Sequence, residues 1–217
     1  MYQNRVEAGR KLAISLSQYQ GRPQTIVLGI GKGGAVVAQA FARALSLPFN
    51  IVLAEPIHMP DQNNLIVGAI AEHSDMWLDE ELLLTLQLTP DSVYDQIEAA
   101  RRRIERLAEF IRPTIGFPDL TEKQVLLVTE GETTGAVLLT QTYSLLKRWQ
   151  TKVMPIAPVA SSFGWQRVQS IIPVSGNRAF CLLAEPILAD LKTYYIDFAE
   201  PSDAQVLTLL QTSILAT

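Results

Sequence analysis

Short apolar runs recur along the chain, and segments with helical spacing of apolar residues separate them. The apolar runs predict buried strands, which begin near residues 25, 49, 124, 152 and 178. The segments with helical spacing predict helices over 5–19, 35–45, 136–149, 161–170 and 202–210. Because parallel strands need a long crossover between them, this alternation predicts an α/β fold with a parallel, doubly wound sheet.

The alternation stops between residues 55 and about 120. Residues 55–64 contain two prolines and two asparagines, which predicts an exposed loop. Short extended runs at 65–72 and 76–78 predict a hairpin. We therefore expect a single domain over residues 1–217, into which residues 55 to about 120 are inserted as a small α+β cap, or hood.

A long amphipathic helix is the main element predicted within the cap. Thr89 and Pro90 form a typical helix start, with Thr as the N-cap and Pro as the first helical residue. One apolar stripe runs along this helix: Val93, Ile97, Ala100, Ile104, Leu107 and Ile111. The three arginines at 101–103 are expected on its solvated face, with Glu98–Arg102 and Arg101–Glu105 pairs four residues apart.

The composition is that of a globular protein, with 48% hydrophobic and 18% charged residues. A net charge of −4 and a pI near 5.3 argue against binding nucleic acid through bulk charge. No apolar run is long enough to span a membrane, and the N-terminus lacks the apolar core of a secretory signal. We therefore expect a cytoplasmic protein that binds neither nucleic acid nor membranes. The two histidines, His58 and His73, have no partners at metal-ligand spacing, so the sequence names no metal ligand.

The most informative stretch is residues 125–135, V-L-L-V-T-E-G-E-T-T-G. An apolar strand runs into a polar loop and then a helix, an arrangement that commonly binds phosphate through N–H groups at the helix N-terminus. Gly131 and Gly135 allow the backbone to curl, and Thr134 can cap the helix. Glu130 suits a hydrogen-bond donor such as a sugar hydroxyl. No Lys follows the second Gly, so the loop is not a P-loop.

A second glycine-rich turn, residues 29–34, follows the first predicted strand. Gly29, Gly31 and Gly34 match the G-x-G-x-x-G fingerprint, with Glu55 about twenty residues further on. A Rossmann-like, dinucleotide-binding protein is therefore one hypothesis; alternatively, the glycines serve only close packing of helix on strand. In doubly wound sheets ligands bind beyond the carboxyl ends of the strands, where both glycine-containing segments are expected.

Five motifs occur in order along nearly the whole chain. They are R-V-E-A-G-R-K-L-A at 5–13, x-x-G-G at 31–34, G-A-I-A-E at 68–72, G-x-x-T-G at 131–135 and Y-x-D-F-x-x-x-S-D at 195–203. Together they resemble a family of predicted phosphoribosyltransferases with the type I phosphoribosyltransferase fold. The resemblance implies a glycosyltransferase of nucleotide metabolism, which binds phosphoribosyl pyrophosphate and replaces the pyrophosphate with a nitrogen nucleophile, usually a base. It also implies Mg²⁺ as the cofactor of an active enzyme.

The resemblance further implies a role for each matching residue. Those that would bind the donor's 5-phosphate and ribose are Thr129, Glu130, Gly131, Glu132, Thr133, Thr134 and Gly135. Those that would cradle its pyrophosphate are Gly31, Lys32, Gly33 and Gly34. Glu130, on the ribose hydroxyls, and Lys32, as charge for the leaving pyrophosphate, are the implied catalytic residues.

The chain departs from the family pattern toward acidity. Thr129 and Glu130 stand where the family usually has two acids, and Glu132 stands at a position that is usually apolar. Lys32 replaces an Arg, and Glu55 follows the second strand where a basic pair is common. A like charge a few ångströms from the donor's phosphates costs on the order of 1–4 kcal/mol. These changes together predict a degenerate donor-binding site.

Two functions stay open beside the dinucleotide hypothesis. One is a working phosphoribosyltransferase, and the other is a catalytically degenerate relative that binds a nucleotide or another phosphate as a sensor or scaffold. Convergence of Glu55, Thr129 and Glu132 on one pocket would favour the second. The expected partner is a small phosphorylated sugar or nucleotide. A homodimer, to which Tyr194 and Tyr195 could contribute, also stays open.

Overall fold

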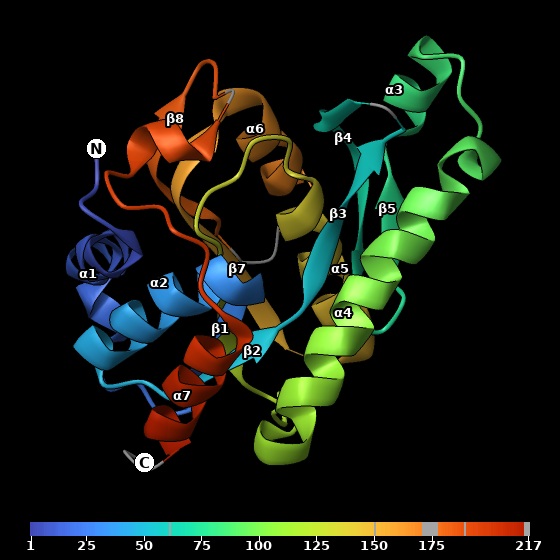
Figure 1. Ribbon diagram of the computed structural model, residues 1–217. Helices are drawn as coiled ribbons and strands as arrows, with labels where there is room; N and C mark the ends of the chain where they lie inside the picture. Colours follow the sequence, from blue (N-terminus) through green and yellow to red (C-terminus); the bar gives the residue numbers. More distant parts are fainter. Residues whose placement is uncertain (61, 150, 171–177, 189, 215–217) are drawn as a thin grey trace.

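The computed structural model describes residues 1–60, 62–149, 151–170, 178–188 and 190–214 (Figure 1). Its centre is a sheet of five parallel strands in the order β2-β1-β6-β7-β8. The strands are β1 Thr25–Ile30, β2 Phe49–Val52, β6 Gln124–Val128, β7 Lys152–Ser161 and β8 Phe180–Glu185. The strand order reverses between β1 and β6, so the predicted parallel, doubly wound α/β fold is confirmed.

Helices cover both faces of this sheet (Figure 1). They are α1 Arg5–Ser15, α2 Gly31–Leu45, α5 Ala136–Arg148, α6 Ser162–Ser170 and α7 Asp203–Ile214. Successive strand residues point to opposite faces, and β1 illustrates this. Val27 belongs to the core under α1 and α2, whereas Ile26 and Leu28 belong to the core under α5 and α6.

An antiparallel sheet, β3-β4-β5, occupies much of the region predicted as the cap. Its elements and the two helices that follow are β3 Ala54–Met59, β4 Gln62–Ala71, β5 Met76–Leu78, α3 Glu80–Thr85 and α4 Tyr94–Ile115. The hairpin predicted between 65–72 and 76–78 is confirmed as β4 and β5. The exposed loop predicted over 55–64 is wrong, because β3 and the start of β4 lie there. Since β3 is an edge strand, Pro56 can pair in it although it has no N–H group.

Helix α4 packs against β3 with its predicted apolar stripe buried. Thr89 and Ser92 form a capping box, which opens a 3₁₀ turn over Pro90–Val93 before α4 begins. The ion pairs of this helix differ from those expected. Arg101 pairs with Glu98, three residues before it, and Arg103 reaches across to Glu55 on β3.

Helix α2 begins at Gly31, so residues 31–34 form its first turn and not a loop as predicted. Gly31 enters the helix with a φ of 62°, which favours glycine. Gly29 lies close to the helix that follows, because a Cβ there would come within 2.6 Å of the Ala35 Cα. At least one glycine of this turn, Gly29, therefore allows the helix to pack closely against the strand.

The segment between β8 and α7 returns to the N-terminus. After a 3₁₀ turn over Leu191–Tyr194, Tyr195 pairs with Tyr2 in a parallel bridge. The predicted capping box of the last helix is confirmed, because Ser202 and Gln205 each accept the other's backbone N–H. Figure 1 shows this segment, in orange and red, running beside the α1 and α2 side of the molecule. Among the described residues, no helix combines the length and the hydropathy needed to cross a membrane.

Candidate functional site

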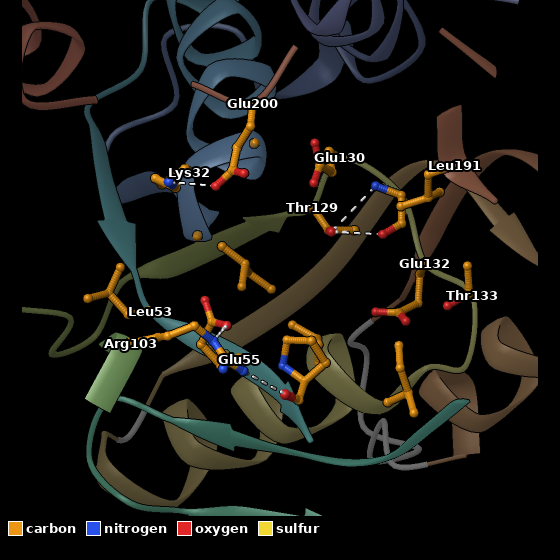
Figure 2. A pocket seen from close by; sticks show the side chains of 18 of the residues that line it. Lys32, Leu53, Glu55, Arg103, Thr129, Glu130, Glu132, Thr133, Leu191 and Glu200 are labelled. Atoms are coloured by element: carbon orange, nitrogen blue, oxygen red, sulfur yellow. Dashed lines mark hydrogen bonds and ion pairs between the residues drawn. The ribbon is translucent and has the colours of Figure 1, made fainter. Parts of the chain in front are cut away.

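A cavity of about 410 Å³ lies beyond the carboxyl ends of β1 and β6, where a doubly wound sheet binds its ligands. The first turn of α2 and the loop after β6 line one part, and β3 and α4 line another (Figure 2). Eight predicted site residues line it: Gly31, Lys32, Gly33, Thr129, Glu130, Gly131, Glu132 and Thr133. The fold therefore brings the two glycine-containing segments to one space.

Three other predicted residues lie outside the lining of this cavity: Gly34, Thr134 and Gly135. Gly34 packs against the end of β6, where an added Cβ would come within 3.0 Å of the Val128 carbonyl oxygen. The hydroxyl of Thr134 accepts the N–H of Ala136 at 3.3 Å and is used inside the loop. Thr134 is not the N-cap of α5 as predicted, because Gly135 occupies that position in a left-handed conformation.

The Glu132 side chain caps α5 instead. Its residue is only 4% exposed, and Figure 2 shows the carboxylate directed from the loop into the site. Oε1 accepts the N–H of Gly135 at 3.0 Å, and Oε2 accepts that of Leu138 at 3.2 Å. Burial raises the pKa of Glu132, while backbone N–H groups, including those of Thr133 and Thr134, act against that rise. An internal carboxylate therefore fills the ring of N–H groups that was expected to bind a phosphate.

Helix α6 covers the same loop from a second side. Gly164 lies so close that an added Cβ would come within 2.7 Å of both the Gly135 nitrogen and the Thr133 oxygen. The Ser161 hydroxyl donates to the Thr133 carbonyl and accepts the N–H of Gly164 at 2.9 Å. The loop is therefore fixed between its own glutamate and a neighbouring helix.

Glu130 binds Arg5 at the edge of the cavity. The Arg5 side chain is 7% exposed and that of Glu130 is 27% exposed. Arg5 also donates to the carbonyl of Ala199 at 2.8 Å and lies 3.9 Å from the centre of the Phe198 ring. Burial raises the pKa of Glu130, and the Arg5 charge opposes that rise. Arg5 thus balances the charge of a carboxylate whose exposed part faces the cavity.

Lys32 points to the segment that precedes α7. Its Nζ lies 2.5 Å from a Glu200 oxygen and 3.4 Å from an Asp203 oxygen, and Figure 2 shows the first of these pairs. The hydrogen bond to Glu200 raises the pKa of Lys32, although partial burial opposes it. The cation expected to face a pyrophosphate is therefore already matched by two carboxylates.

Glu55 and Arg103 form a further ion pair on the wall opposite the loop. The Arg103 Nε lies 2.7 Å from a Glu55 oxygen, and a second nitrogen lies 3.5 Å from the carbonyl oxygen of Pro56. Both side chains line the cavity. Glu55, Thr129 and Glu132 thus converge on one pocket, which is the arrangement expected of a degenerate donor site.

No group of three His, Cys, Asp or Glu side chains suited to a metal ion occurs among the described residues. Glu130, the acid expected nearest to a ribose, is bound to Arg5. Mg²⁺ is usually held by one or two carboxylates together with substrate phosphates, so it stays an expectation that rests on the resemblance.

Sequence reasoning missed several residues that line the cavity, among them Arg5, Arg103, Phe198 and Glu200. Arg5 and Phe198 lie within two of the motifs that carried the resemblance, and those motifs were the available signal. No local pattern marked Arg103, and Glu200 falls at an unspecified position of the motif at 195–203. Their positions depend on how α4 packs against β3 and on the path of the chain before α7.

The fold and the cavity define an α/β protein with a cavity at the carboxyl edge of a doubly wound sheet. The crystal structure of TT1426 from Thermus thermophilus is similar to it, with a TM-score of 0.75 and 25% sequence identity. The similarity covers 97% of this chain and 98% of that chain. No family model matches the sequence.

Two curated proteins show which kind of α/β protein this chain is similar to. They come from Mycobacterium tuberculosis strains CDC 1551 / Oshkosh and H37Rv, and each is named "Putative phosphoribosyl transferase". Each is 25% identical to this chain over 211 residues, which is 97% of this chain and 46% of the relative. The chain thus spans under half the length of these curated relatives. The similarity confirms the resemblance to phosphoribosyltransferases that the motifs indicated.

Proposed function

We propose that this chain is a phosphoribosyltransferase-like protein that binds a small ribosyl ligand in the cavity but does not transfer a phosphoribosyl group from phosphoribosyl pyrophosphate. It would act as a sensor or scaffold. One observation carries the proposal: the Glu132 carboxylate accepts the N–H groups of Gly135 and Leu138, in the loop where the donor's 5-phosphate is expected. A phosphate would have to displace this carboxylate or lie beside it.

The charges around the cavity support the proposal. Arg5 is paired with Glu130, Lys32 with Glu200 and Arg103 with Glu55. Phosphoribosyl pyrophosphate is strongly anionic and would have to break such pairs to use these cations. Two like charges about 4 Å apart repel by about 4 kcal/mol at an effective dielectric constant near 20, so each remaining carboxylate weakens donor binding.

A working transferase is the second candidate, and the names of the two mycobacterial relatives favour it. In that case Glu130 would contact the ribose hydroxyls and Lys32 the pyrophosphate, and Mg²⁺ would be expected with the donor. The cytoplasmic location expected from the sequence is part of either proposal, and a homodimer stays possible in both.

The deciding experiment is calorimetric titration with phosphoribosyl pyrophosphate and Mg²⁺, together with an assay of pyrophosphate release in the presence of purine and pyrimidine bases. We expect no donor binding tighter than about 1 mM and no release above the uncatalysed rate. Ribose 5-phosphate, AMP and NAD are titrated beside the donor, the last to test the dinucleotide hypothesis. Micromolar donor binding with base-dependent pyrophosphate release would establish the second candidate.

A further inference from the structure

N–H groups at the start of α5 already donate to a carboxylate of the chain itself. Glu132 supplies this carboxylate from inside the loop, within hydrogen-bonding distance of the Gly135 and Leu138 nitrogens. The N–H groups of Thr133 and Thr134 also act on this carboxylate. A 5-phosphate binds at a helix N-terminus through such groups, so the carboxylate and the phosphate compete for the same donors.

The loop also cannot make room by moving outward. Gly164 of α6 lies against the backbone of Gly135 and Thr133 at a distance that leaves no space for a Cβ. The Ser161 hydroxyl ties the Thr133 carbonyl to the end of β7. Any widening of the loop would therefore have to displace α6 as well.

Other parts of the cavity contain groups that suit a ribose and a base, namely a carboxylate and apolar side chains. The Glu130 carboxylate is partly exposed at the cavity edge and is held by Arg5. A carboxylate has two oxygens that can accept hydrogen bonds from neighbouring hydroxyl groups. Apolar side chains, among them Leu53, Leu107 and Leu191, line further parts of the cavity and suit the faces of a planar ring.

Positive and negative side chains are equal in number in the lining of the cavity. Among the described residues that line the cavity there are four carboxylates and four cations. They are Glu55, Glu130, Glu132 and Glu200, and Arg5, Lys32, Arg103 and Lys192. The described part of the lining therefore has no excess of cationic side chains over carboxylates with which to attract an anionic ligand.

We propose that the cavity selects a ribonucleoside without a 5-phosphate over the corresponding nucleotide, because the Glu132 carboxylate stands where the phosphate would bind. The inference rests on the proposed function, since it assigns the ligand class of the same cavity. Its test is separate from that of the proposed function. The test compares the affinity for a nucleoside with the affinity for its monophosphate, and it does not measure transferase activity.

The test is calorimetric titration of the wild-type chain with adenosine, guanosine, cytidine and uridine, each beside its own 5-monophosphate. We expect at least one nucleoside to bind ten-fold or more tightly than its monophosphate. Tighter binding of the monophosphates throughout would overturn the inference while leaving the proposed function intact. Absence of binding by every probe up to millimolar concentration would overturn both.

A matched pair of variants tests the role of Glu132 itself. Glu132→Leu removes the carboxylate from the loop, and Glu109→Leu removes one from the exposed surface of α4, so both change the net charge equally. We expect the Glu132→Leu variant to bind the monophosphate more tightly than the nucleoside. We expect the Glu109→Leu variant to bind the nucleoside more tightly, as the wild type does. Thermal melting checks that both variants fold, and the wild-type comparison stands without them. Base-dependent pyrophosphate release by the wild type would overturn the proposed function and the inference with it, whereas tighter binding of the monophosphates without such release would overturn the inference alone.

Discussion

Two glutamates separated by a single glycine have different tasks at the residue scale. Glu132 is buried and satisfied by backbone N–H groups, whereas Glu130 keeps an exposed part and is balanced by Arg5. Burial raises the pKa of both carboxyl groups, and a different partner opposes the rise in each case. A glutamate side chain therefore acts as an internal helix cap at position 132 and as a candidate ligand contact at position 130.

Gly33 lies directly against the Glu130 carboxylate. An added Cβ would fall within van der Waals contact of the Glu130 carboxylate, 2.6 Å from Oε1. We expect Gly33→Ala to push Glu130 off Arg5 and to lower the free energy of unfolding by about 3 kcal/mol, the cost of uncoupling a buried ion pair. Chemical denaturation measures the change.

The control for Gly33→Ala is the same substitution in a Glu130→Ala background. There the clash is absent, so we expect the glycine replacement to cost less than about 1 kcal/mol. An equal cost in both backgrounds would show that Gly33 matters for its backbone and not for its contact with Glu130.

At the scale of elements, one aspartate fastens the β4–β5 hairpin to α5. Asp75 accepts hydrogen bonds from Ser144 at 2.8 Å, Lys147 at 2.8 Å and Arg148 at 2.9 Å. Burial acts to raise the pKa of Asp75, but these three partners outweigh it and hold the pKa below its ordinary value of 3.8. The hairpin is therefore held to the main domain by an ionised carboxylate.

We expect Asp75→Asn to lower the free energy of unfolding by about 2–3 kcal/mol at neutral pH, because hydrogen bonds to a charged group are lost. The pH dependence has a definite sign. A lowered pKa in the folded state stabilises the protein above pH 3.8, and this stabilisation disappears as the pH falls through the folded-state pKa. Denaturation curves between pH 2 and 7 should show a smaller acid loss in the variant. Asp91→Asn, at an exposed position, is the control and should follow the wild type.

The correction at β3 also belongs to the scale of elements. Proline indicates a loop because most strands need every N–H group, and asparagine does so because its side chain hydrogen-bonds to nearby backbone. Pro56 lies in an edge strand, and only the pairing of β3 with β4 reveals that its missing N–H costs nothing. A local pattern does not contain that information.

At the scale of the whole molecule, Arg112 joins the second sheet to the main sheet. Its guanidinium donates twice to the Glu72 carboxylate, each time at 2.6 Å, and once to the Ile51 carbonyl on β2 at 3.0 Å. The side chains of Arg112 and Glu72 are 16% and 11% exposed. This two-pronged pair therefore links the end of α4, the end of β4 and β2.

We expect Arg112→Gln to lower the free energy of unfolding by about 3 kcal/mol, because Glu72 is left as a largely buried and unpaired charge. Replacing both residues by leucine should recover much of the loss. Arg102→Gln, at an exposed position of the same helix, should change stability by less than about 0.5 kcal/mol. Equal effects of Arg112→Gln and Arg102→Gln in chemical denaturation would show that the Glu72 pair does not stabilise the fold.

The segment that precedes α7 lies against the N-terminus at this scale. Tyr2 pairs with Tyr195, and this places Arg5, Phe198 and Glu200 at the edge of the cavity. The site is therefore built from segments that are distant in sequence. Short sequence motifs therefore identify the loop of this site but not the way in which its charged side chains are paired.

The sequence by itself determined the features that have a local period or a local signature. Alternating apolar runs and amphipathic segments specified the doubly wound sheet, one apolar stripe specified the buried face of α4, and the strand–loop–helix pattern at 125–135 located the site. The tertiary structure alone decided where charges point. Glu132 turns inward because N–H groups of α5 receive it and α6 covers the loop, and Lys32 is neutralised by a segment from the other end of the chain. The free energy of a charged side chain depends on which donors and counter-charges the folded chain brings to it, and spacing along the sequence does not fix them.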